Sequence, residues 1–170
     1  MKKLIGLIFA LLTILTIACD NKPIEPFELS IADYNYSLAY SILYKLSNEN
    51  LTILFRGELE NEKDSILYST NDLPKRKIRK LANIKIDSLS IFYSNNCVRD
   101  GDVKSFYFKK GGVSKKVQLN NYYHKDLSPT IEIINEIVPE KYRMNYNVER
   151  TNKCGSYTII KDWDDIKSEK

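Results

Sequence analysis

Two adjacent glycines at 111–112 impose the strongest local constraint on this chain, because they separate two segments of strand character, residues 103–110 and 113–120. Glycine adopts the positive φ angles of a two-residue hairpin turn without steric cost. A two-residue turn places Phe106 opposite Val117. We therefore predict an antiparallel hairpin with one core-facing side, which carries Phe106, Phe108, Val113, Val117 and Leu119.

The remaining elements follow from hydrophobic periodicity. Apolar residues alternate with others over residues 38–46, which favours a strand, although a helical stripe through the same residues leaves a helix as the rival interpretation. Runs of strands with helices between them predict an α+β domain, an antiparallel β-sheet built from hairpins with two helices packed on one face. Outside the glycine hairpin, strands are predicted over residues 38–46, 51–59, 65–69 and 86–93, and helices over residues 72–84 and 129–138.

The composition fits a single globular domain. Of 170 residues, 43% are hydrophobic and 28% charged, which supplies one core and excludes a disordered chain. Three cysteines are too few for a scaffold built from disulfides. The net charge of +4 is too small to predict a nucleic-acid partner, and none is expected.

The first 19 residues have the pattern of a secretory signal. Two lysines precede a nearly continuous apolar run from Leu4 to Ile17, and Ala18 and Cys19 follow it. As a helix this run would measure about 21 Å, which is shorter than the roughly 30 Å of a bilayer's hydrocarbon core. A permanent transmembrane anchor is therefore not expected.

The ending Leu15-Thr16-Ile17-Ala18-Cys19 resembles the lipobox of bacterial lipoproteins, except that Thr16 replaces the leucine usual three positions before the cysteine. The resemblance covers residues 1–19 only. It implies that diacylglyceryl is attached to the Cys19 sulfur and that a peptidase then cuts just before this residue. The implied partner is the membrane, because two or three acyl chains hold a protein firmly at about 0.8 kcal/mol per buried methylene. The implied location is the bacterial cell envelope, on the inner or outer membrane.

These features divide the chain into four parts. Residues 1–18 form the signal peptide, and residues 19–27 form the acylated cysteine with an extended tether that contains two prolines. Residues 28–138 are expected to form the single α+β domain, and residues 139–170 a polar C-terminal extension. The mature chain keeps 24 of the 26 Lys and Arg residues against 22 Asp and Glu, so it is nearly neutral.

Cys97 and Cys154 remain once Cys19 is acylated, and a secreted domain meets an oxidising compartment. A disulfide between them would span 57 residues of chain and contribute roughly 4 kcal/mol on the chain-entropy model. It would fasten the C-terminal extension to the loop before the glycine hairpin. Two unpaired cysteines are the alternative, and the sequence leaves both open.

His124 is the only histidine of the chain. A histidine-rich zinc site is therefore excluded, and any histidine-based catalysis would rest on this one ring. Its neighbours are types that often recognise ligands, although a loop between a strand and a helix also uses them for turns and capping. The weak binding candidates are Asn121, Tyr122, Tyr123 and His124.

Five cations stand within six residues of the first predicted helix. A solvated helix face explains them, but on a lipid-anchored domain they would also meet anionic head groups, at about 1 kcal/mol for each cation near the surface. This basic patch consists of Lys75, Arg76, Lys77, Arg79 and Lys80.

Motifs that specify a reaction are missing from the sequence: it has no G-x-S-x-G, phosphate loop, H-E-x-x-H or glycine-rich dinucleotide fingerprint. The aspartates at 100–102 and 162–165 lack the closing glutamate of a calcium loop. We therefore assign no catalytic residue, cofactor or metal. The expected function is a lipid-anchored envelope protein that binds or inhibits another envelope protein without catalysis. The alternatives are an envelope hydrolase that uses His124 and a module that binds glycan or lipid.

Overall fold

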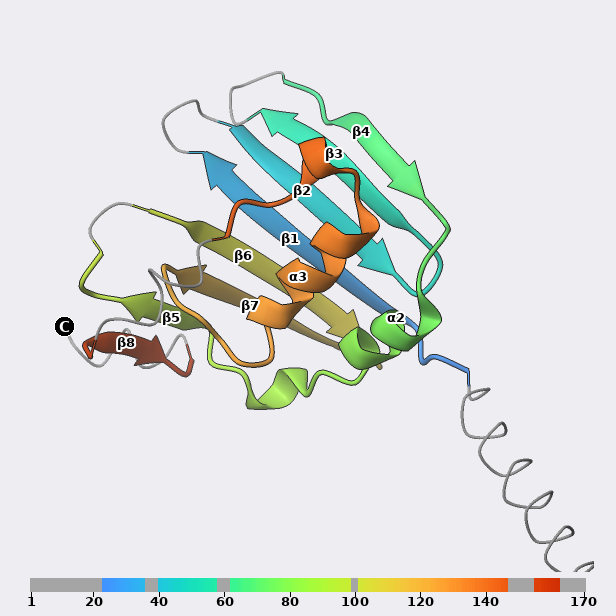
Figure 1. The fold of residues 1–170 in the computed structure, drawn as a ribbon. Coiled ribbons are helices and arrows are strands. Elements are labelled where there is room, and N and C mark those ends of the chain that lie inside the picture. Colours follow the sequence, from blue (N-terminus) through green and yellow to red (C-terminus); the bar gives the residue numbers. More distant parts are fainter. Residues whose placement is uncertain (1–22, 36–39, 58–61, 99–100, 147–154, 163–170) are drawn as a thin grey trace, which may run out of the picture.

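The computed structural model describes residues 23–35, 40–57, 62–98, 101–146 and 155–162. Within these residues, eight strands form one sheet in the order β4-β3-β2-β1-β6-β7-β5-β8 (Figure 1). The strands are β1 (Phe27–Asn35), β2 (Tyr40–Ser47), β3 (Leu51–Gly57), β4 (Ser65–Thr70), β5 (Phe92–Asn95), β6 (Val103–Lys110), β7 (Val113–Asn120) and β8 (Tyr157–Ile160).

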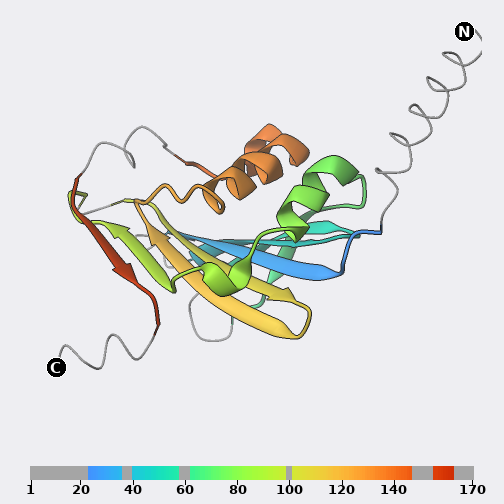
Figure 2. The same cartoon turned by 90° about the horizontal axis from the view of Figure 1, so that it is seen from below.

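The described part of the chain also contains two α-helices, α2 (Lys75–Ala82) and α3 (Ser128–Ile137), and two short 3-10 helices, η2 (Ile86–Ser88) and η3 (Glu140–Tyr142). Figure 2 shows α2 and α3 above the same side of the sheet. A mostly antiparallel sheet with two helices confirms the predicted α+β class. The sheet is not built from hairpins alone, because β5 runs parallel to β7 and β1 pairs with β6, a strand distant in sequence.

Strand β1 lies in the middle of the sheet, between β2 and β6, and was not predicted. Its apolar residues alternate along the strand, so a period-two signal was present in the sequence. The predicted tether ended at residue 27, and residues 28–35 were placed in the domain without an assigned element. Opposite Leu29 stand Leu46 of β2 and Phe108 of β6, so β1 joins two halves that are distant in sequence.

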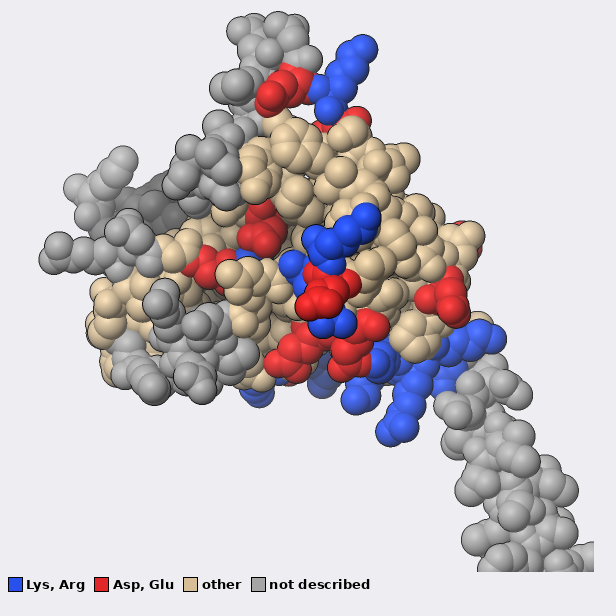
Figure 3. Space-filling model, turned by 45° about the horizontal axis from the view of Figure 1, so that its top comes forward, with Lys and Arg blue, Asp and Glu red and all other residues tan. Residues whose placement is uncertain are grey.

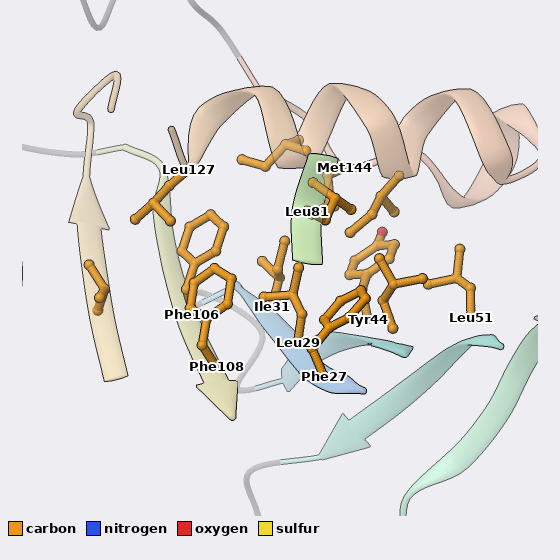
Figure 4. Close-up of a cluster of buried hydrophobic side chains, with 14 of the residues drawn as sticks. Phe27, Leu29, Ile31, Tyr44, Leu51, Leu81, Phe106, Phe108, Leu127 and Met144 are labelled. Atoms are coloured by element: carbon orange, nitrogen blue, oxygen red, sulfur yellow. The ribbon is translucent and has the colours of Figure 1, made fainter. Parts of the chain in front are cut away.

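The core fills the space between the sheet and the helices (Figure 4). Directly opposed residues lie on the same face of a sheet, so the register places Ile31, Tyr44 and Phe106 on one face. The same buried cluster contains Ile78 and Leu81 of α2. It also contains buried residues of α3, β3 and β7, namely Leu51, Ile53, Val117, Leu119, Ile131 and Ile134.

The glycine hairpin is confirmed in bounds and register. Strands β6 and β7 end at the turn, where Gly111 has a φ of 55° and Gly112 a φ of 81°. Phe106 lies opposite Val117, and both are fully buried. The prediction was wrong for Val113, which is 44% exposed because it lies at the turn, beyond the edge of the core.

The strands predicted over residues 38–46 and 86–93 have different outcomes. Residues 40–47 form strand β2, so the helical alternative for this segment is excluded where it is described. The single strand predicted over 86–93 is wrong, because the segment forms η2 first and β5 begins only at Phe92. Leu89, Ile91 and Tyr93 are all buried, and their alternate spacing resembled a strand although β5 begins only at Phe92.

The sheet and core extend on both sides of the predicted domain range 28–138. Phe27 is buried as the first residue of β1, and Ile24 packs against the core. Met144 is buried after α3, and β8 adds the last strand to the sheet. No helix among the described residues has the length and apolar character needed to span a membrane. The predicted signal peptide and Cys19 lie outside the described residues.

Candidate functional site

The segment before α3 is organised by His124. The Nδ1 atom of His124 accepts hydrogen bonds from the backbone N–H groups of Asp126 (3.2 Å) and Leu127 (3.3 Å). The His124 backbone N–H donates to Ser128 Oγ (2.9 Å), and the Ser128 N–H donates to the His124 carbonyl (2.9 Å). Burial lowers the pKa of His124 below 6.5, an effect that Asp126 opposes. This geometry makes His124 the acceptor that closes the turn into α3.

The hydroxyl of Ser128 has two partners, since Tyr146 Oη also donates to it. The predicted helix began at Pro129, whereas α3 begins one residue earlier, at Ser128. Burial raises the pKa of Tyr146 to about 12. Tyr146 therefore stays neutral and keeps its proton for this bond, which fastens the segment after η3 to the start of α3.

Two of the predicted binding candidates beside His124, Tyr122 and Asn121, contact other parts of the fold. The Tyr122 ring contacts the rings of Tyr93 (centroids 5.2 Å apart) and Tyr157 (5.4 Å), and the His124 ring contacts Tyr93 (4.7 Å). Asn121 adopts a φ of 49°, and its Oδ1 accepts a hydrogen bond from the N–H of Asp102 (2.8 Å). The aromatic rings therefore connect β5 and β8 to the loop before α3, with Tyr93 buried and Tyr157 43% exposed.

A buried ion-pair cluster, which the sequence analysis missed, lies on the core face. Lys104 is only 1% exposed, and its ammonium group binds Asp33 Oδ1 (2.8 Å) and Asp102. Burial raises the pKa of Asp33, although Lys104 acts against this shift. Burial and the nearby Asp33 also raise the pKa of Tyr44. Lys104 alternates with Phe106 and Phe108 along β6, so the sequence did carry a signal in the form of a cation on an apolar face.

Removing either carboxylate would leave the buried charge of Lys104 partly uncompensated. The intact cluster therefore stabilises the pairing of β1 with β6. Asp33 and Lys104 face each other directly in the register of these two strands.

Among the described residues, no group of three or more His, Cys, Asp or Glu side chains is placed to hold a metal ion.

A groove of about 770 Å³ runs between α2 and α3. Its floor is apolar and includes Leu81, Ile84 and Ile133. Its walls carry opposite charges, with lysines on the α2 side and glutamates on α3, and an ion pair between Lys77 and Glu136 connects them. Figure 3 shows acidic and basic side chains mixed over this part of the molecule. The buried hydroxyl of Thr130, which lines the groove, has no hydrogen-bond partner among the described residues.

The predicted basic patch lies on α2, next to the start of the described chain. Lys110 Nζ donates to the carbonyl oxygen of Ala82, at the end of α2 (2.7 Å), and pairs with Glu25 (3.0 Å). Lys75, Arg76 and Lys80 are exposed. In Figures 1 and 2 the blue start of the chain and α2 lie at the same end of the molecule, and Figure 3 shows Lys and Arg gathered there.

One of the two outer edges of the sheet is formed by β4, which has the sequence SILYST and carries no charged residue, and the other by β8. Among the described residues, β4 has a hydrogen-bonded neighbour on one side only, strand β3. Ile66 is 70% exposed and Leu67 36% exposed. The register between β3 and β4 shifts once, between Ile53 and Leu54, where a bulge interrupts the ladder. Asp64, just before the strand, is bound by Arg56 through two hydrogen bonds.

Only one of the two cysteines of the predicted disulfide belongs to the described residues. Cys97 follows β5 and its N–H donates to Asn95 Oδ1 (3.0 Å), whereas Cys154 lies outside the described residues. The pairing of β5 with β8 places Asn95 opposite Tyr157, so the chain segments that lead to the two cysteines leave the same end of this strand pair. The bridge stays a prediction, which titration of thiols in the native protein checks.

No family model matches the chain, and no curated protein and no solved structure matches it either.

Proposed function

We propose that the mature chain is a lipid-anchored protein of the bacterial envelope that acts by binding another envelope protein at the edge strand β4, without catalysis. The observation that carries the proposal is an edge strand of six residues with no charge and two exposed aliphatic side chains. The anchor part rests on the lipobox-like ending at Cys19.

An uncharged edge strand supports protein binding because its outer side presents unpaired backbone N–H and C=O groups. Soluble proteins usually protect such edges with lysine, proline or inward-pointing charges, since an open edge pairs with any compatible strand. The bulge beside Leu54 provides only local protection. A partner strand added to β4 would gain backbone hydrogen bonds, and Ile66 and Leu67 would add apolar contact.

The groove between α2 and α3 is a weaker candidate for protein binding. Its walls are already connected by the ion pair between Lys77 and Glu136, which an inserted segment would have to break. Both side chains are exposed, so breaking the pair costs at most about 1 kcal/mol. The β4 edge requires no such exchange within the domain.

The hydrolase alternative has less support because of how His124 is used. Its Nδ1 accepts two backbone hydrogen bonds, so it is not the donor that an orienting carboxylate requires in a catalytic triad. The glycan alternative has less support because the Tyr122 ring packs against Tyr93 and Tyr157.

Site-specific photocrosslinking tests the proposed binding strand in the full-length protein in its native membrane. A photoreactive phenylalanine analogue replaces Ile66 in one version and Tyr107 in the matched control. Tyr107 is 42% exposed and points away from the core on β6. We expect a covalent adduct with a different envelope protein from position 66 and none from position 107. No adduct from position 66, equal adducts from both positions, or an adduct of two copies of this chain contradicts the proposal.

A second variant tests the pairing itself. The double substitution Ile66→Lys and Leu67→Lys gives the edge the charges that normally prevent strand addition. We expect the crosslinked partner, once identified, to lose its copurification with this variant. The circular dichroism spectrum should not change, because both side chains are exposed. Unchanged copurification shows that the partner binds elsewhere.

Anchoring is tested separately with Cys19→Ser. We expect this variant to leave washed membranes while the unchanged protein stays with them, since the acyl chains attach to the Cys19 sulfur. Equal retention of both proteins contradicts the anchor and leaves the crosslinking result unaffected.

A further inference from the structure

We propose that the α2 side of the domain docks on the anionic lipid surface to which the chain is tethered, so that the domain is held in one orientation. The docking surface consists of Lys75, Arg76, Lys80 and Lys85, and we call it the α2 cation surface. The proposal rests on the proposed anchoring at Cys19, and it adds an interaction surface with lipid head groups as its partner.

Charge is distributed unevenly along the chain. Residues 72–88, which include α2 and η2, carry six Lys and Arg against two Asp, at positions 72 and 87. The rest of the mature chain then holds 18 Lys and Arg against 20 Asp and Glu, so it is slightly acidic. The whole positive excess of the mature chain therefore lies in this one segment.

The cations of the α2 cation surface are exposed and have no carboxylate partner among the described residues. The nearby acidic side chains Glu25 and Glu136 are engaged with Lys110 and Lys77. Four exposed cations thus remain available to an external anionic surface. They are opposed by the exposed Asp72 and Asp87 and by Asp126 and Glu132, which line the same groove as Lys80 and Lys85.

The attachment point of the chain brings these cations near the membrane. Glu25 pairs with Lys110, which also binds the carbonyl oxygen of Ala82 at the end of α2. Glu25 is the sixth residue after Cys19, so this part of the domain can move no more than about 20 Å from the acylated residue. Helix α2 itself is only about 12 Å long.

At these distances the orientation of the domain decides whether its cations lie within the electrostatic field of the bilayer. That field falls off over about 8 to 10 Å at physiological ionic strength. With the α2 cation surface toward the lipid, four cations enter the field, whereas the opposite orientation places the slightly acidic remainder there. Each cation near an anionic surface favours docking by about 1 kcal/mol, or about fivefold in the docked population.

Lysine footprinting measures this orientation in the acylated full-length mature protein. The protein is reconstituted into vesicles of phosphatidylcholine alone or with about a third of phosphatidylglycerol, and an amine-reactive ester labels exposed lysines before mass spectrometry. We expect Lys75, Lys80 and Lys85 to react at least about fivefold more slowly on anionic vesicles. The exposed control lysines Lys45, Lys63 and Lys116 should react equally on both.

A second experiment repeats the footprinting in 1 M salt, which shortens the Debye length to about 3 Å. We expect the slower labelling of Lys75, Lys80 and Lys85 to disappear in 1 M salt. Equal labelling on the two vesicle types at low salt, slower labelling that survives high salt, or slower labelling of the control lysines overturns the proposal.

A third experiment measures the labelling of Lys85 in variants that lack other cations. The triple substitution Lys75→Gln, Arg76→Gln and Lys80→Gln should abolish the protection of Lys85, whereas the matched triple Lys45→Gln, Lys63→Gln and Lys116→Gln should preserve it. Protection of Lys85 in both triples contradicts a role for α2. Failure of the anchor is recognised separately, because Cys19→Ser then remains on washed membranes whatever the footprint shows.

Discussion

The two helices over the sheet differ in what their side chains do. Helix α3 has no basic residue, carries Glu132 and Glu136, and buries Ile131 and Ile134 completely. Helix α2 carries five cations in eight residues and no acidic residue in its first turn. Because the positive end of the helix dipole lies at the N-terminus, Lys75, Arg76 and Lys77 are placed where cations destabilise a helix. The comparison indicates that α3 contributes mainly by packing against the core, whereas the cations of α2 contribute to the charge of the molecular surface.

The largest expected difference between the helices concerns their buried isoleucines. Ile134→Ala in α3 should lower the free energy of unfolding by about 3 to 5 kcal/mol, because it leaves a cavity under a helix fastened at its start. Ile78→Ala in α2 should cost about 2 to 3 kcal/mol, because an eight-residue helix at the end of the sheet relaxes more easily. Urea denaturation of the two variants measures both values. Equal losses contradict the distinction.

The next effect concerns the hydrogen bonds that fasten the start of α3. Ser128→Ala removes the acceptor for the His124 N–H and the Tyr146 hydroxyl, and leaves both donors in a partly buried site. We expect a loss of about 1 to 3 kcal/mol in the free energy of unfolding. The matched variant Ser114→Ala, at an exposed position of β7, should change it by less than about 0.5 kcal/mol.

A smaller effect tests His124 and depends on pH. His124→Ala removes the acceptor of two backbone hydrogen bonds and should cost about 1 kcal/mol, whereas His124→Asn retains an acceptor and should cost less. The folded pKa of His124 is below 6.5, so the unfolded chain binds the proton first as pH falls. Stability of the unchanged protein should therefore decline as pH falls below about 6.5.

Thermal unfolding of both variants between pH 5 and 7.5 supplies the measurement for His124. Both variants should lose the part of the pH dependence that His124 contributes. A pH profile identical to that of the unchanged protein shows that the ring does not titrate differently in the folded state.

The smallest expected effect concerns the free energy that is lost by placing cations near the N-terminus of α2. Lys75→Glu places an anion in the first turn and should raise the free energy of unfolding by about 0.3 to 1 kcal/mol. Lys80→Glu, in the last turn, should lower it by a similar amount. Chemical denaturation at low salt compares the two. Destabilisation by Lys75→Glu would show that the first-turn cations are needed for folding.

Local patterns were sufficient where the interacting residues are close in sequence. The glycine pair fixed the β6–β7 hairpin to the residue, because a two-residue turn admits one register. The α+β class also followed from periodicity. The position of β1 between β2 and β6 was not predictable in the same way, since Leu29 meets Phe108 only through a long-range pairing.

The roles of individual polar residues were harder to predict from their types. His124 was a candidate for binding or catalysis, yet its Nδ1 completes the turn into α3. Lys104 passed unnoticed although it occupies an apolar face, because its partners Asp33 and Asp102 come from a different strand and from a loop. Such roles depend on which groups burial brings together.

The class of fold, the glycine hairpin and the cationic helix could be predicted because each depends on residues that are neighbours along the chain. The edge position of β4, the burial of Lys104 against two carboxylates and the place of the α2 cations beside the start of the described chain became visible only in the folded molecule. These outcomes depend on long-range strand pairing and on the exclusion of water from a shared core, which no short segment specifies alone.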